Sequence, residues 1–418
     1  MLDAESSALV SRVASNAMRQ AIGAGLFFGF TFLLARALGN AGYAKYFVSW
    51  NLAQILVASV SFGLYNGTIR RLSRGEASHA VILSLIRPHI AQLLVIAVAS
   101  VLLGLFAGYD GKLIFLVAAA TTFGTLLTAI SLGLDSFRVF AFGELLHNCV
   151  LLILVGIYMP RSPDTVGWLF IPAALAKAVY YGLTLHRSVY RSSVGQTGAI
   201  TSDDVRSYAI LAYGHSLLQI ATFRGFVIAS GYLVPIGGMA QLAVVWSFCD
   251  RSLTLVQGIN QVLYPRLMRS SVSTALRFWI NAGTSAAYLI TVFVLTGGYW
   301  VLSEWGYARP MELDYPGLLL CVALLPHVVR LLKMTEALAL SRFRALYMSH
   351  AMTIIAAAFV FAVVWRIRSF SFAGPPMLIF IASCVGLIAF YRRAAPTESA
   401  AGKLMIQLAN KQISKKEC

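Results

Sequence analysis

Runs of apolar residues recur along the whole chain, separated by short segments that are rich in Gly, Pro or charge. A run of about 20 apolar residues crosses the hydrocarbon core of a bilayer as a helix, with its backbone hydrogen bonds closed internally. The pattern therefore predicts an all-α, polytopic membrane protein with about 12 transmembrane helices. The predicted spans lie near residues 16–37, 43–66, 89–109, 113–134, 141–159, 165–185, 209–230, 237–263, 278–301, 316–338, 345–365 and 372–391.

Composition supports the membrane interpretation. Hydrophobic residues make up 59% of the 418 residues and charged residues 12%, and the mean hydropathy is +0.76. Soluble domains carry about half apolar and about a quarter charged residues. The supply of polar side chains is too small for a water-soluble surface, and the spans leave no room for a separate soluble domain.

The basic residues that give the net charge of +17 are unevenly distributed among the connections between spans. Arginines cluster in alternate connections, as with Arg70 and Arg71 after the second span and Arg187 and Arg191 after the sixth, and the tail is basic. The opposite connections carry few basic residues. The positive-inside rule then predicts that both termini are cytoplasmic. Basic residues dispersed over many loops argue against nucleic acid as a partner, and they can contact anionic membrane lipids.

Six spans in each half predict a parallel repeat about an axis along the membrane normal. A shift of 196 positions aligns Gly42 with Gly238 and Arg70 with Arg266. We therefore expect an N-terminal six-helix bundle over 1–195, a C-terminal six-helix bundle over 196–391 and a basic cytoplasmic tail over 392–418. Binding sites in repeated transporters lie where the halves meet.

Polar side chains inside the spans mark the place to look for function, because an ionisable group in hydrocarbon normally faces a partner or a wet cavity. The eighth span carries a stripe of Asp250, Thr254, Gln257 and Gln261 on one helical face. Guanidinium groups bind phosphate oxygens bidentately, so a set of intramembrane cations favours a cavity for a phosphate- or pyrophosphate-bearing substrate. The predicted substrate-binding residues are Arg19, Gln54, Arg224, Asp250, Arg251, Gln257, Arg330 and Lys333.

Structural roles compete with this interpretation. Cations near helix ends, including Lys177 in the sixth span, can snorkel to the interface or join helices. Asp250 can neutralise its neighbour Arg251, and Lys333 can pair with Glu336 three residues on.

Enzyme signatures are absent from the sequence. It contains no GxxxxGK[ST], HExxH or GxSxG motif. Glu144 and Asp135, near the turn between the fourth and fifth spans, are interpreted as isolated acids. The five cysteines lack CxxC spacing and the seven histidines lack metal-ligand spacing. We predict that the protein is not an enzyme and uses neither a cofactor nor a metal.

Several short motifs carry a family resemblance. The run LLARALGNAGYAKYFVSW, with its ARxLG turn followed by Gly42-Tyr43, resembles the opening of the polysaccharide-transporter family. Phe223-Arg224-Gly225 and Tyr264-Pro265-Arg266-Leu267 resemble the corresponding features of the second half. That family contains the Wzx-type O-antigen flippases, in the superfamily that also holds the multidrug and toxic-compound extruders. The likeness covers the twelve-helix layout over nearly the whole chain, but the motifs are short.

The resemblance implies a flippase in the bacterial inner membrane. Its substrate would be an undecaprenyl-pyrophosphate-linked oligosaccharide, an O-antigen or exopolysaccharide repeat unit, moved by alternating access of two bundles. The polysaccharide polymerase and chain-length machinery are further candidate partners. Arg224 and Asp250 match cavity-lining positions of that layout. Many members carry an acidic residue soon after the arginine, whereas Gly225 and Phe226 follow here, so the resemblance does not extend to ion coupling at that position.

Other functions remain open on the sequence. A cation-coupled multidrug exporter of the same fold is the main alternative, and it would need acids inside the helices. Asp250 is the one strong intramembrane acid that the sequence indicates. A major-facilitator transporter normally has an aspartate before the arginines of its second loop, whereas Gly67-Thr68-Ile69-Arg70-Arg71 has none. A membrane glycosyltransferase or polymerase needs a longer external loop than residues 302–315 provide.

Overall fold

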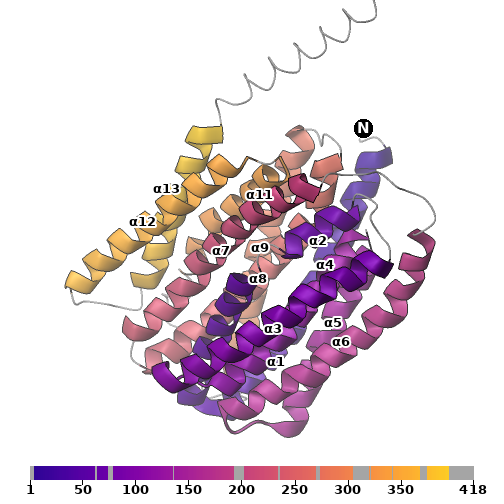
Figure 1. The fold of residues 1–418 in the computed structure, drawn as a ribbon. Helices are drawn as coiled ribbons and strands as arrows, with labels where there is room; N and C mark the ends of the chain where they lie inside the picture. Colours follow the sequence, from indigo (N-terminus) through magenta and orange to yellow (C-terminus); the bar gives the residue numbers. More distant parts are fainter. Residues whose placement is uncertain are drawn as a thin grey trace, which may run out of the picture.

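The computed structural model describes residues 4–61, 64–73, 79–134, 136–192, 202–233, 236–269, 274–304, 320, 322–340, 342–367 and 374–394, and these residues are almost entirely helical. The helices run side by side as a bundle of long rods (Figure 1). They are α1 (Ala4–Val60), α2 (Leu64–Ser73), α3 (His79–Ala107), α4 (Gly111–Gly133), α5 (Phe137–Tyr158), α6 (Pro163–Ser192), α7 (Ser202–Leu233), α8 (Ile236–Arg269), α9 (Thr274–Glu304), α11 (Leu325–Ala339), α12 (Phe343–Ile367) and α13 (Gly374–Ala394).

α1 is a continuous helix of 57 residues with a kink at Gly39, whose φ of 65° and ψ of 179° are not helical. This backbone conformation is open to glycine and costly for other residues. Gly39 divides α1 into two arms, which contain the predicted spans 16–37 and 43–66 up to residue 60.

Each of the twelve predicted spans overlaps a described helix or an arm of α1, and the span 43–66 also includes the first residues of α2. Within the described residues, seven helices are long and apolar enough to cross a membrane by length and composition, counting the two arms of α1 together. Polar residues inside α7 and α8 lower their hydropathy. The predicted boundary between the bundles at 195/196 and most of the predicted tail lie outside the described residues.

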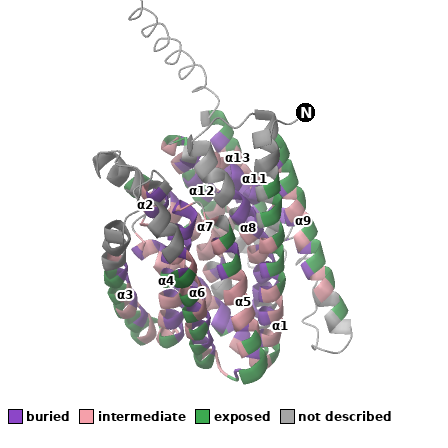
Figure 2. Cartoon of the chain, turned by 90° about the vertical axis from the view of Figure 1, so that its right-hand side faces the viewer, coloured by how far each residue is buried: buried purple, intermediate pink, exposed green. Residues whose placement is uncertain are grey.

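The outer surface of the bundle is apolar. Exposed residues follow the outward faces of α3 and α9 (Figure 2), and large hydrophobic side chains are among them. Phe106 on α3 is 83% exposed and Trp279 on α9 is 71% exposed. Apolar surface of this extent is expected of a face covered by lipid.

The interior is held together around α1, which packs most extensively against α8 and also contacts α4, α5 and α7. Hydrogen bonds tie α1 to α8 and α7. Tyr43 and Ser247 join it to α8 with their hydroxyl oxygens 3.1 Å apart, and the Tyr213 hydroxyl of α7 donates to the backbone carbonyl of Ser59 at 2.6 Å. These contacts lie toward opposite ends of the second arm of α1.

Candidate functional site

A cavity of about 560 Å³ lies inside the bundle, between α1, α2, α4, α5 and α6 on one side and α7, α8 and α11 on the other. Apolar rings such as Phe27, Trp50 and Phe170 form part of its wall. The wall also holds ionisable side chains and many neutral polar ones. The ionisable residues are Glu144, His147, Lys177, His215 and Arg251, and the neutral polar ones include Gln20, Gln54, Thr121, Thr125, Thr128, Asn148, Ser216, Gln219, Thr254, Asn260 and Thr335.

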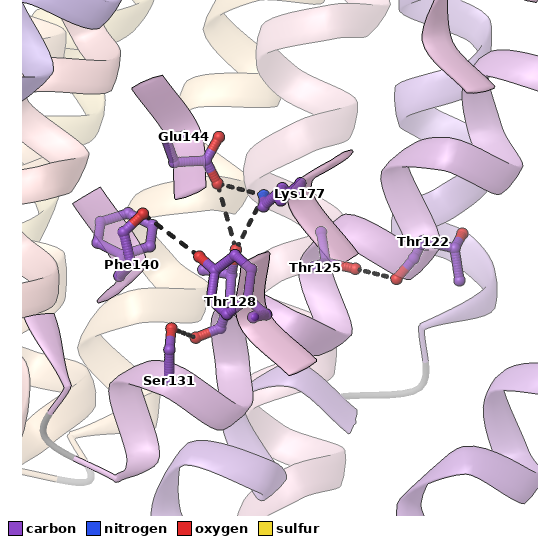
Figure 3. A network of polar contacts seen from close by, with 8 residues as sticks. Thr122, Thr125, Thr128, Ser131, Phe140, Glu144 and Lys177 are labelled. Atoms are coloured by element: carbon purple, nitrogen blue, oxygen red, sulfur yellow. Dashed lines mark hydrogen bonds and ion pairs between the residues drawn. The ribbon is translucent and has the colours of Figure 1, made fainter. Parts of the chain in front are cut away.

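An ion pair bridges two helices on the N-terminal side of the cavity. Lys177 on α6 places its Nζ atom 2.5 Å from the Oε1 atom of Glu144 on α5. The same ammonium donates to the Thr128 hydroxyl of α4 at 3.3 Å. Figure 3 shows the three side chains converging between these helices. The interpretation of Glu144 as an isolated acid is therefore wrong. The carboxylate of Glu144 is part of the cavity wall, whereas that of Asp250 lies outside this wall.

Arg251 is the other strong cation of the wall. Its guanidinium carbon lies 3.1 Å from the ring centroid of Phe27, a cation–π contact. Within the described part of the chain, its Nε atom is buried without a hydrogen-bond partner. A second, much smaller cavity is lined by Phe27, Asp250 and Arg251 among others.

Asp250 pairs with Arg224 and not with its sequence neighbour. The Nη2 atom of Arg224 on α7 lies 2.8 Å from Oδ1 of Asp250, and Nη1 donates to the side-chain oxygen of Asn51 at 3.2 Å. Adjacent residues of a helix do not face each other, so Asp250 and Arg251 project in different directions. The pair leaves Arg251 as the cation that faces the cavity on α8.

The structure separates the remaining predicted site residues. Gln54 lines the cavity and donates to the Thr121 hydroxyl at 3.3 Å. Arg19 lies over the ring of Phe142, 5.3 Å from its centroid, and is not part of the wall. Gln257 lies on α8, but its side chain is outside the described residues.

Arg330 and Lys333 on α11 also lie away from the wall, whose α11 residues are Leu331, Met334, Thr335 and Leu338. Arg330 is fully buried. Lys333 pairs with Glu336, with Nζ and Oε2 3.4 Å apart. These two cations of α11 therefore do not face the cavity that Arg251 and Lys177 share.

Buried histidines connect the cavity to Arg330. The Nη2 atom of Arg330 lies 3.1 Å from Nδ1 of His350 on α12, and Nε2 of His350 lies 2.9 Å from Nδ1 of His215 on α7. Arg330 also donates to the Thr353 hydroxyl at 2.6 Å. His215 lines the cavity, so the chain of contacts ends at its wall.

Sequence reasoning left Glu144 and His215 out of the predicted site, and it weighed Lys177 as a cavity cation against a structural role; the structure brings all three to the cavity wall. Their positions inside apolar spans were the available signal, but nothing in the spacing joins helices this far apart in the chain. Among the described residues, no group of three His, Cys, Asp or Glu side chains could hold a metal ion.

Comparison with known proteins identifies the fold. No protein-family model matches the sequence, and no curated protein matches it significantly. The structure is similar to the MATE transporter ClbM in complex with Rb⁺, with 14% identity, a TM-score of 0.60 and coverage of 92% of this chain and 94% of that one. It is also similar to the eukaryotic MATE transporter AtDTX14, at 15% identity, a TM-score of 0.59 and coverage of 94% and 96%.

A MOP superfamily transporter from Pyrococcus furiosus is a third similar structure, with 14% identity, a TM-score of 0.56 and coverage of 91% and 95%. All three likenesses extend over nearly the whole chain. The protein therefore has the fold of the MATE transporters of the MOP superfamily. The prediction of an all-α polytopic membrane protein is confirmed.

Proposed function

We propose that the protein is a membrane transporter that flips an undecaprenyl-pyrophosphate-linked oligosaccharide across the bacterial cytoplasmic membrane. The two sides of the cavity would open alternately to the two faces of the membrane. The lipid-linked oligosaccharide is the proposed substrate, with both termini in the cytoplasm. No reaction chemistry is required of the residues at the cavity.

Arg251 carries this proposal. Its guanidinium lies in the cavity wall, while the nearest carboxylate on the same helix, Asp250, is bound to Arg224. A guanidinium that keeps unused donors can take phosphate oxygens, and such charge-assisted bonds are the stronger class. Lys177 adds a second cation, already paired with Glu144. Arg251 is therefore the proposed contact for an anionic group in this cavity.

A cation-coupled multidrug exporter is the second candidate function. Glu144 favours it, because a carboxylate in a cavity wall can attract a cationic drug or an exchanging cation. The similar structures include a multidrug resistance MATE family transporter. Lys177 opposes it, since its ammonium already neutralises that carboxylate at 2.5 Å.

A leaflet-access assay separates the two candidates. The purified protein is placed in vesicles with a fluorescent polyprenyl-pyrophosphate oligosaccharide, and lipid moved between leaflets is measured by quenching from outside. We expect transfer by the wild type, a loss of about tenfold or more in Arg251→Ala, and partial retention in Arg251→Lys, which keeps the charge but not the planar fork.

Lys333→Ala is the matched control, because it removes a cation from a helix beside the cavity without altering the wall. Equal loss in Arg251→Ala and Lys333→Ala would show that general cationic charge, and not the Arg251 site, is responsible. Transport of cationic dyes against a proton or sodium gradient, without movement of any polyprenyl pyrophosphate, would establish the exporter in place of the flippase.

A further inference from the structure

Hydrogen bonds link Arg330, His350 and His215 in a row. The guanidinium of Arg330 fixes which atom donates and which accepts in each of them. Arg330 is fully buried, and a guanidinium donates hydrogen bonds without accepting any. Its contact with Nδ1 of His350 at 3.1 Å is a hydrogen bond only if Nδ1 carries no proton. His350 then holds its ring proton on Nε2.

The same reasoning passes to the next ring. Nε2–H of His350 donates across 2.9 Å to Nδ1 of His215, which must therefore be unprotonated. His215 in turn carries its proton on Nε2. Arg330 on α11 thus sets the tautomer of His215 on α7 through His350 on α12. In each ring, the hydrogen bond made by one nitrogen decides that the other nitrogen carries the proton.

His215 ends this relay at the cavity wall. Its Nδ1 is used by His350, and in the described part of the chain its Nε2 has no hydrogen-bond partner. The Nε2–H group of His215 is held in one orientation by this buried row of hydrogen bonds. Such a donor suits recognition of an oxygen acceptor, because the side chain is already ordered before the ligand binds.

The surroundings indicate which acceptor. Among the described residues, the polar side chains that α7 and α11 contribute to the wall besides His215 are Ser216, Gln219 and Thr335, all uncharged. Glu144, Lys177 and Arg251 come from α5, α6 and α8. Ser216 and Gln219 lie within one turn of His215. Neutral donors and acceptors beside apolar surface match hydroxyl groups better than phosphate, which favours guanidinium.

We propose that His215 is a hydrogen-bond donor, preset by Arg330 and His350, for the hydroxyl-bearing sugar portion of the substrate. Arg251 on α8 takes the pyrophosphate. The inference rests on the proposed function and divides its site into two parts, a charged subsite for the linkage and an uncharged subsite for the sugar.

The relay itself is tested without substrate. Nitrogen chemical shifts of ¹⁵N-labelled histidine, measured by NMR in lipid nanodiscs, distinguish a protonated ring nitrogen from a bare one. We expect Nε2–H and bare Nδ1 for both His215 and His350, assigned through the signals that disappear in His215→Phe and His350→Phe. An Nδ1–H tautomer at His215 would overturn the relay.

Binding tests the sugar subsite, with two ligands: polyprenyl pyrophosphate alone and the same lipid with an oligosaccharide. Loss of one neutral hydrogen bond lowers affinity by about 3- to 10-fold. We expect His215→Phe to weaken binding of the sugar-bearing lipid by this factor and to leave the sugar-free lipid unchanged. His215→Gln, which can place an N–H near the position of Nε2, should recover part of the loss.

His327→Phe is the matched control, because His327 is buried against Phe223 and does not line the cavity. An equal loss for both lipids in His215→Phe, or none for either, overturns the sugar subsite while the proposed function stands. If the wild type binds neither lipid, the proposed function fails and the sugar assignment fails with it, whatever the tautomer of His215.

Discussion

The guanidinium of Arg224 on α7 lies 2.8 Å from the carboxylate of Asp250 on α8, and both side chains are largely buried, at 15% and 13% exposure. Arg224 also reaches Asn51 on α1. The pair therefore joins three helices beside the cavity. Asp250 is engaged by Arg224, while Arg251 lines the cavity.

Removing one partner of this pair should cost more stability than removing both. A buried charge without its counter-ion destabilises a protein by about 3–5 kcal/mol, whereas apolar replacement of both partners is often close to neutral. We expect Arg224→Met to lower the unfolding temperature in detergent by several degrees, and Arg224→Met/Asp250→Leu to recover most of it. Equal unfolding temperatures for the single and double variants would contradict the pairing.

The ion pair of Lys177 and Glu144 should respond unequally to the loss of each partner. Lys177 is 6% exposed, whereas Glu144 is 31% exposed at the cavity. Glu144→Leu leaves the more deeply buried charge behind, so we expect it to destabilise more than Lys177→Met. A double-mutant cycle of unfolding free energies should give a coupling of about 1–3 kcal/mol.

The pair of Lys333 and Glu336 on α11 provides the comparison for that cycle. Its lysine is more exposed than Lys177, at 28%, and the Nζ–Oε2 distance is longer, at 3.4 Å between residues one helix turn apart. Its coupling should be a few tenths of a kcal/mol. A coupling for Lys177 and Glu144 that is no larger than this would mean that their contact does not stabilise the bundle.

The helices were predictable because the length of an apolar run is a local property of the chain. The polar contacts were not, since pairing rules within one helix cannot reach from Arg224 to Asn51, 173 positions away. Sequence reasoning placed Arg251 beside Asp250 as a possible pair, and the geometry of the helix turns the two apart. Arg330 looked like a cavity cation because nothing in the sequence shows which face of α11 is turned inward.

A pH effect is expected at the turn between α3 and α4. The Asp110 side chain accepts a hydrogen bond from the backbone N–H of Leu113 at 2.9 Å and caps α4. Burial raises the pKa of the Asp110 carboxyl, and nearby Asp164 also raises it. A raised pKa favours the neutral carboxyl in the folded protein. The resulting contribution to stability is therefore fully present below the ordinary pKa of an aspartate, and it is lost as the pH rises through the raised pKa of Asp110 in the folded protein.

Asp110→Asn should therefore be slightly more stable than the wild type at neutral pH, because asparagine also caps helices and carries no charge. The difference in unfolding temperature should shrink as the pH falls toward about 4, the ordinary range of an aspartate. Solvent screening keeps the effect small. A variant that is less stable than the wild type at neutral pH would show that the charge of Asp110 is needed for the cap.

The kink at Gly39 should depend on glycine through the backbone alone. Its φ of 65° lies outside the helical region, and a Cβ atom added there would meet nothing within 4 Å. Gly39→Ala should therefore cost about 1–3 kcal/mol in unfolding free energy by strain and not by crowding. Gly25→Ala, in a regular part of the same helix with equally open space, should instead stabilise by up to about 1 kcal/mol. If the two alanine variants change the unfolding temperature in the same direction and by the same amount, α1 does not bend at Gly39.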